Sequence, residues 1–92
     1  MRTIWKYMID PISLEIDMPQ GAYILCAKEQ HDEIFIWAEV DPNAIKERRF
    51  FEVFGTGHNI DTSVVGGRLY IGTAMLNGGN LVFHIYERKV KK

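Results

Sequence analysis

The chain has 92 residues, enough for one hydrophobic core, so we expect a single domain over residues 1–92. Hydrophobic residues make up 47% of the chain and charged residues 25%, a balance that is typical of a folded protein and excludes a disordered one. The 11 Lys and Arg residues against 12 Asp and Glu residues give a net charge of −1. General nucleic-acid binders carry a large basic excess, so this charge disfavours that function.

Cysteine usage and hydropathy indicate in which cellular compartment the protein is expected. Cys26 is the only cysteine, so no internal disulfide can form, and we expect a reducing compartment. No apolar run approaches the ~18 residues that a membrane-spanning helix needs, so we predict no membrane partner. Residues 1–10 carry charges within their apolar run and have no small-residue cleavage site, so we expect no signal peptide.

Short alternating runs of apolar and polar residues, separated by turn signals, predict β-strands along the whole chain. We expect strands over residues 3–9, 13–18, 22–30, 34–40, 48–54, 68–76 and 81–89. Asp41, followed by Pro42, is also a candidate N-cap for a single helical turn that reaches Arg48.

Two turn signals predict hairpins. His31-Asp32 joins the third and fourth strands, and Asn77-Gly78-Gly79-Asn80 joins the last two, where Asn and Gly supply the positive φ angles of tight turns. Strands that follow one another through tight turns pair antiparallel. The predicted fold is therefore mainly β: a small antiparallel β-sandwich or a partly open barrel of six or seven strands, with at most one short helix.

Several predicted strands have an aliphatic face, which we assign to the core, and an aromatic, partly polar face. The predicted core residues are Ile34, Ile36, Val53, Leu81, Phe83 and Ile85. A solvated sheet face would instead be rich in Lys, Glu, Thr and Ser. Either the chain's own loops or a second sheet cover the aromatic face, or another subunit or a ligand does. We predict a homo-oligomer whose interface includes Trp5, Phe35, Trp37 and Tyr86.

The sequence carries little evidence of catalysis. Cys26, His31, His58 and His84 are scattered, without the spacing of a metal site, so we expect no metal. No nucleotide-cofactor fingerprint occurs, and we predict no cofactor. Cys26 lies in an apolar strand, where a small buried thiol is the ordinary case. No nucleophile–base pair is visible, so we assign no catalytic residue and favour a non-enzymatic protein.

The segment Phe54-Gly55-Thr56-Gly57-His58 admits two interpretations. As a turn, its glycines allow a sharp exit from a strand while Thr56 and His58 cap backbone groups. As a ligand site, glycines on both sides of a hydroxyl expose backbone N–H groups that form an anion-binding nest. His58 then adds a donor, and Phe54 adds a stacking surface. Both interpretations remain open at the level of sequence.

Six short blocks lie in order along nearly the whole chain: RTIWKY, MPQGAYIL, WAEVDP, FGTGH, YIGT and LVFHIYE. Together they resemble a family of small, uncharacterised proteins from tailed-phage and prophage genomes. The chain departs from the family pattern at Asn59, where a proline is usual, and in the stretch DTSVVGGRL. The resemblance implies a phage origin and a product located in the host cell cytoplasm, and it implies no known reaction.

Two classes of function follow. The first is a non-enzymatic accessory protein that binds an anionic, nucleotide-like small molecule or a host protein, with counter-defence as a purpose that fits by analogy. The alternative is a minor phage assembly or structural protein that only self-associates. An enzyme is the third and least favoured class.

Overall fold

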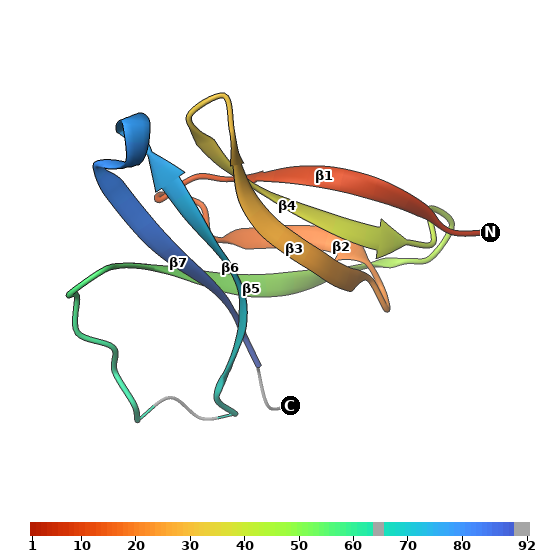
Figure 1. Cartoon of the computed structure of the whole chain (residues 1–92). Coiled ribbons are helices and arrows are strands. Elements are labelled where there is room, and N and C mark those ends of the chain that lie inside the picture. The colour runs from red at the N-terminus through yellow and green to blue at the C-terminus, as the bar shows by residue number, and fades with distance from the viewer. Residues whose placement is uncertain (64–65, 90–92) are drawn as a thin grey trace.

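In residues 1–63 and 66–89, which a computed structural model describes, the chain forms seven β-strands and one short 3-10 turn (Figure 1). The strands are β1 (Thr3–Ile9), β2 (Glu15–Pro19), β3 (Tyr23–Gln30), β4 (Glu33–Val40), β5 (Lys46–Gly55), β6 (Arg68–Leu76) and β7 (Leu81–Arg88). The 3-10 turn η1 (Asn77–Gly79) joins β6 to β7.

The strands form two sheets that pack face to face. The first sheet has the order β1-β4-β3, and the second has the order β2-β5-β7-β6. Each pairing between the described strands is antiparallel. The sheets do not close into a barrel, and this arrangement confirms the predicted small antiparallel β-sandwich.

The predicted strand boundaries agree with the structure to within two residues. The helical turn predicted from Asp41 to Arg48 is wrong, because β5 already begins at Lys46. Asp41 does cap local backbone: its Oδ1 accepts the N–H of Asn43 at 3.0 Å, and its carbonyl accepts the N–H of Ala44 at 3.1 Å. These bonds close a turn, and the extended backbone of β5 follows directly.

Both predicted hairpins are present, and their turns use left-handed backbone. His31 and Asp32 have φ angles of 53° and 62°, and Asn77 and Gly78 have φ angles of 53° and 65°. Such turns match the right-handed twist of the flanking strands. The Asp32 carboxylate also accepts the N–H of Asn77 at 2.6 Å. This hydrogen bond ties the hairpin of the first sheet to the hairpin of the second.

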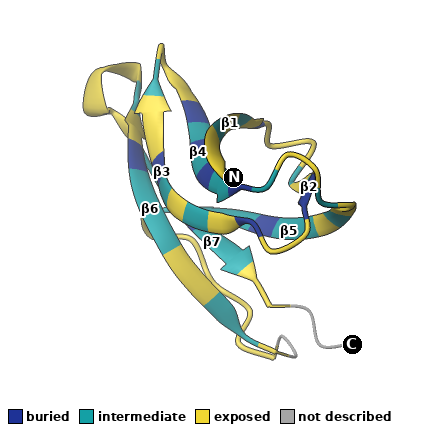
Figure 2. Cartoon of the chain, turned by 90° about the vertical axis from the view of Figure 1, so that its right-hand side faces the viewer, coloured by how far each residue is buried: buried dark blue, intermediate teal, exposed yellow. Residues whose placement is uncertain are grey.

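The core lies between the sheets and follows the alternation of each strand (Figure 2). Its buried residues are Ile9, Met18, Ala22, Ala27, Ile34, Ile36, Ala38, Val40, Phe51, Ala74 and Ile85. Val53 and Phe83 pack against them, as predicted. Leu81 does not belong to the buried set: it is 48% exposed because β7 begins at an open end of the sandwich.

The two sheets come into backbone contact where β6 lies against β3. A Cβ atom added to Gly72 would lie 2.2 Å from the carbonyl oxygen of Ala27, far inside van der Waals contact. The pairing of β6 with β7 shifts register between Tyr70 and Gly72, as at a β-bulge. Glycine is therefore required at position 72 by the close approach of another backbone.

We predict that Gly72→Ala destabilises the fold, because the sheets must separate to admit the methyl group. Overpacking of this kind costs ~1–3 kcal/mol of unfolding free energy. Urea unfolding measures the cost. Met75→Ala is the matched control on the same strand, since Met75 is 60% exposed and its truncation should change stability by only ~0.5 kcal/mol. Equal stability of the two variants would contradict the close contact.

Candidate functional site

An apolar pocket of about 450 Å³ opens at one end of the sandwich. The ends of β5 and β6 and the beginnings of β4 and β7 meet there, because antiparallel neighbours bring alternate strand ends together. The apolar wall is formed by Ile9, Ile34, Val53, Leu76, Leu81 and Phe83. The pocket is thus an unfilled continuation of the core that reaches the surface.

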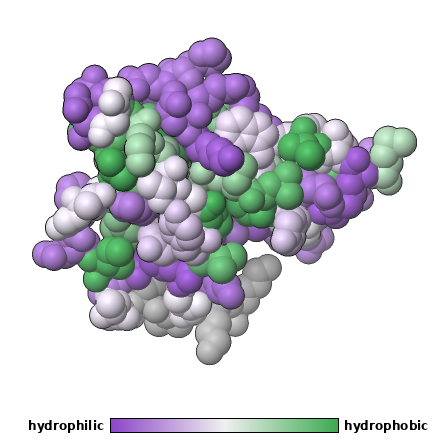
Figure 3. All heavy atoms as spheres, in the orientation of Figure 1, coloured by the Kyte–Doolittle hydropathy of each residue, from purple (hydrophilic) through white to green (hydrophobic). Residues whose placement is uncertain are grey.

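The mouth of the pocket is polar. Asp10, Asp32, Glu33 and His58 line it with exposed side chains. Figure 3 shows hydrophilic residues over the tips of the two hairpins at this end, with hydrophobic residues directly beside them. The site therefore combines an apolar interior with a mouth that carries three carboxylates.

Toward the end of the sandwich opposite the pocket, an ion pair fills the space between the sheets. Arg49 lies on the core side of β5 and forms a bidentate pair with Glu87, with Nη2 2.9 Å from Oε1. Its Nη1 donates to the Ala22 carbonyl at 2.9 Å, which links the pair to the segment before β3. The hydrogen bonds to Glu87 raise the pKa of Arg49 above its ordinary value, so the pair stays charged.

The predicted loop site borders the pocket and forms a closed turn. Gly55 N–H donates to Nδ1 of His58 at 3.1 Å, and His58 N–H donates to the Gly55 carbonyl at 3.0 Å. Thr56 N–H donates to the Val82 carbonyl at 3.1 Å, and Gly57 has a φ angle of 89°. Three of the N–H groups expected to form an anion nest are therefore engaged within the protein, which favours the turn interpretation.

Thr56 faces the other way, toward the surface of the second sheet that is turned away from the core. Its Oγ1 lies 2.8 Å from Nε2 of His84, and Nδ1 of His84 lies 3.1 Å from Oγ1 of Thr73. The Thr73 hydroxyl lies 2.5 Å from the Tyr70 hydroxyl. Three of the six blocks noted in the sequence, FGTGH, YIGT and LVFHIYE, thus meet in one hydrogen-bonded network, Thr56–His84–Thr73–Tyr70.

Sequence reasoning missed the pairing of Thr56 with His84, which depends on strand register. Phe54 pairs opposite His84 in the ladder between β5 and β7, so Thr56 follows within reach of the imidazole. A hydroxyl beside an imidazole is the beginning of a nucleophile–base pair. Here the second ring nitrogen bonds a neutral hydroxyl, where a triad has a carboxylate, so the geometry favours an anchor for the loop.

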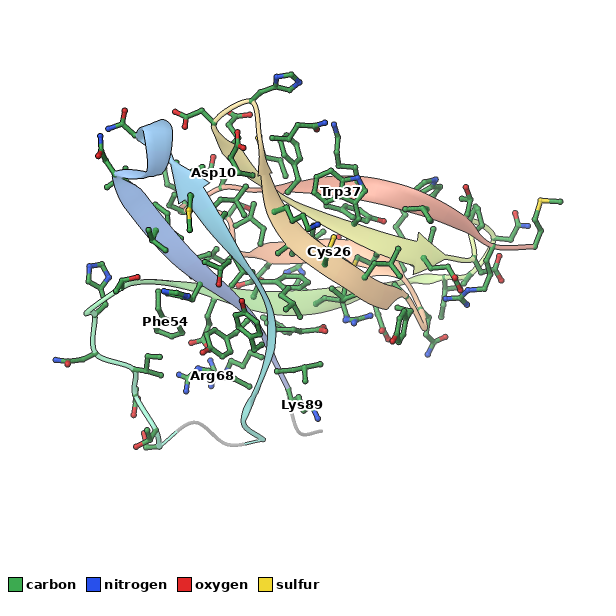
Figure 4. The ribbon with its side chains drawn as sticks, in the orientation of Figure 1. Asp10, Cys26, Trp37, Phe54, Arg68 and Lys89 are labelled. Atoms are coloured by element: carbon green, nitrogen blue, oxygen red, sulfur yellow. The ribbon has the colours of Figure 1, made fainter. Side chains whose placement is uncertain are left out.

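Phe54 belongs to an aromatic cluster on the same surface. Its ring makes an edge contact with Tyr86 at 5.8 Å, and Tyr86 makes another with Tyr70 at 5.6 Å. The guanidinium of Arg68 lies 5.3 Å from the Phe54 ring centroid and pairs with Glu52. Figure 4 shows Phe54 and Arg68 below β5, beside the segment that follows this strand. The ring of Phe54 is therefore already in contact with Arg68 and Tyr86.

The four residues predicted for an oligomer interface lie on three different surfaces. Trp5 pairs opposite Ala38 and packs against the core, and Tyr86 lies in the aromatic cluster of the second sheet. Phe35 and Trp37 remain together on the outer face of the first sheet, 6.0 Å apart, where Figure 4 shows Trp37. Trp5 and Trp37 lie on opposite faces of the first sheet, because Trp5 pairs with Ala38 and the next position of β1, Lys6, pairs with Trp37. The interface itself stays a prediction.

Cys26 pairs opposite Trp37 and is partly buried, so it is less enclosed than its apolar neighbours suggest. In the described part of the chain, no three His, Cys, Asp or Glu side chains are grouped so that they would hold a metal ion. Over the same residues, no helix has the length and apolar character needed to cross a membrane.

We predict that Thr56→Val loosens the loop, because it removes the hydroxyl bonded to His84 while keeping the side-chain shape. The loss of one such bond costs ~0.5–1.5 kcal/mol. In this variant the backbone amide of residue 56 should exchange its hydrogen faster than in the unmodified protein. Urea unfolding should show the lost stability. Thr62→Val is the matched control on the same segment, since Thr62 is exposed. Unchanged exchange in Thr56→Val would show that the network does not anchor the loop.

Comparison with curated proteins and with solved structures finds no match. One family matches over residues 1–92, and its description is "Domain of unknown function (DUF7352)". Because that match covers the whole chain, including every residue of the pocket and of the Thr56–His84–Thr73–Tyr70 network, the chain belongs to the DUF7352 family.

Proposed function

We propose that this chain is a non-enzymatic binding module that holds an apolar group of a partner protein in the pocket at the open end of the sandwich. The observation that carries the proposal is the apolar wall contributed by both sheets, with a volume of about 450 Å³. Ligand sites of ~300–1,000 Å³ with mostly apolar linings are typical of proteins. Leu81 lies at the mouth and is 48% exposed, so binding would cover apolar surface that is in water.

The geometry supports a protein partner over the anionic small molecule. An anion at the mouth would meet the carboxylates of Asp10, Asp32 and Glu33, and like charges repel. The loop offers little in return, because the N–H groups of Gly55 and His58 already bond one another's acceptors. The resemblance to phage and prophage proteins supports a host protein in the host cytoplasm as the partner, and counter-defence as the purpose.

A neutral apolar probe tests the pocket. We predict that N-acetyl-phenylalanine amide shifts the NMR signals of Ile34, Leu76 and Phe83 in a saturable way, because its ring enters the apolar wall. Leu81→Trp should abolish these shifts, since the larger side chain fills the mouth. Leu69→Trp is the control: Leu69 is 50% exposed and does not line the pocket. Absence of saturable shifts in the unmodified protein would remove the basis of the proposal.

A second candidate, a self-associating assembly protein, rests on the outer face of the first sheet. Ile4 and Met8 lie there beside Phe35 and Trp37, and they are 57% and 51% exposed. The Lys6 ammonium lies 4.6 Å from the Phe35 ring centroid, which covers part of the ring. An exposed patch of apolar side chains is rare on monomers, so this face is a candidate for contact with a second copy of the chain.

If this face joins two copies, Trp37→Glu should shift sedimentation from dimer to monomer at micromolar concentration, because it buries a charge in the interface. Far-ultraviolet circular dichroism should stay that of a β protein. Met75→Glu, on the outer face of the second sheet, should leave the sedimentation unchanged. A monomer in the unmodified protein would exclude this candidate.

A further inference from the structure

The carboxylates at the mouth of the pocket determine which partner fits. The residues that line the pocket include Asp10, Asp32 and Glu33, and no Lys or Arg is among them in the described part of the chain. An occupant that carries a positive charge next to its apolar group would gain attraction, and one that carries a negative charge would be repelled.

No ion pair within residues 1–63 and 66–89 uses these three carboxylates. The ion pairs formed there by Arg2, Arg48, Arg49 and Arg68 use other acidic residues. Asp10 and Asp32 accept hydrogen bonds from the backbone N–H groups of Ile12 and Asn77, which are neutral donors. A neutral donor orients a carboxylate without cancelling its charge.

His58 does not present its Nδ1 to an occupant, because that nitrogen accepts the Gly55 N–H at 3.1 Å within the loop. Glu29 adds a further carboxylate next to the mouth, where its Oε2 accepts the N–H of Asp32 at 2.7 Å.

The carboxylates at the mouth come from one sheet only, whereas the apolar wall has contributions from both sheets. Asp10 follows β1 and Asp32 and Glu33 belong to the β3–β4 hairpin, so the carboxylates come from the first sheet. Leu81 and Phe83 come from the second sheet. An apolar anchor directed toward Phe83 would therefore leave its flanking groups beside carboxylates from two separate chain segments. Two spaced positive charges suit this mouth better than the single head group of a small amphiphile.

We infer that the pocket recognises a polypeptide segment of a partner protein in which Lys or Arg flanks an apolar anchor residue, an inference that rests on the proposed binding function. Because the carboxylates are exposed, each pair with a cation is weak, and two or three pairs together amount to about a tenfold preference over an anionic segment. The preference should shrink as salt screens the charges.

Three peptides of equal length test the inference: Ac-Gly-Lys-Phe-Lys-Gly-amide and its analogues with Gln or Glu in place of both Lys residues. Titration followed by NMR should give the Lys peptide about tenfold tighter binding than the Glu peptide at low salt, with a smaller difference at high salt. The double variant Asp10→Asn with Glu33→Gln should lose most of the preference. The control Glu15→Gln with Asp17→Asn, whose residues lie near Arg48 and outside the pocket, should keep it.

Every other result of these titrations overturns a stated part of the proposal. Equal binding of the three peptides overturns the charge selection and leaves the binding function standing, whereas failure of all three peptides and of the neutral probe overturns both. Binding of the neutral probe alone, or of hexylammonium as tightly as the Lys peptide, overturns a polypeptide occupant. Self-association of the protein that Leu81→Trp abolishes would show that a second copy occupies the pocket, and would overturn a separate partner.

Discussion

The contact of Gly72 with the Ala27 carbonyl is the constraint on which the arrangement of the sheets depends. At this point one backbone lies against another with no side chain between them, so β3 and β6 set the separation of the two sheets along one side. Elsewhere the space between the sheets has to be filled by side chains. Arg49 and Glu87 do so with a polar pair, which holds one part of the sandwich closed. Where neither backbone contact nor side chain fills the space, the pocket remains.

The loop after β5 lies at the border of two surfaces and contacts both. His58 packs its ring on Gly55 and lines the mouth of the pocket, whereas Thr56 bonds His84 on the outer side of the second sheet. Two residues of one turn therefore lie in different environments, His58 at the pocket and Thr56 at the outer surface of the second sheet. The loop is therefore one link between the pocket and the aromatic surface, and β7 is another, because its alternate residues Phe83 and His84 face the pocket and the outer surface respectively.

Alternation predicted the strands, and five of the six predicted core residues lie in the core or pack against it. The prediction was clearest for β4, because one face of that strand is aliphatic without interruption, from Ile34 to Val40. It could not orient β1, where both faces are apolar: Ile4 and Met8 on one side resemble Trp5 and Ile9 on the other in hydropathy. The sequence also could not predict which polar side chains bind one another. Arg49 and Glu87 are 38 positions apart, and Thr56 and His84 are 28 apart, so both pairs depend on register. The pocket depends on how the ends of strands from the two sheets lie relative to one another, and no local sequence pattern predicts that arrangement.

The mutual cover of β3 and β6 has a consequence for the chain's behaviour at high concentration. Every open sheet presents two edge strands, and exposed edges promote intermolecular β-pairing and aggregation. By lying against each other, β3 and β6 shield one edge of each sheet, which leaves β1 and β2 as the strands at the other edges. These two carry features that discourage pairing: Lys6 places a charge in the middle of β1, and β2 ends at Pro19, which has no N–H to donate. Colloidal stability of this small sandwich therefore depends on two short strands.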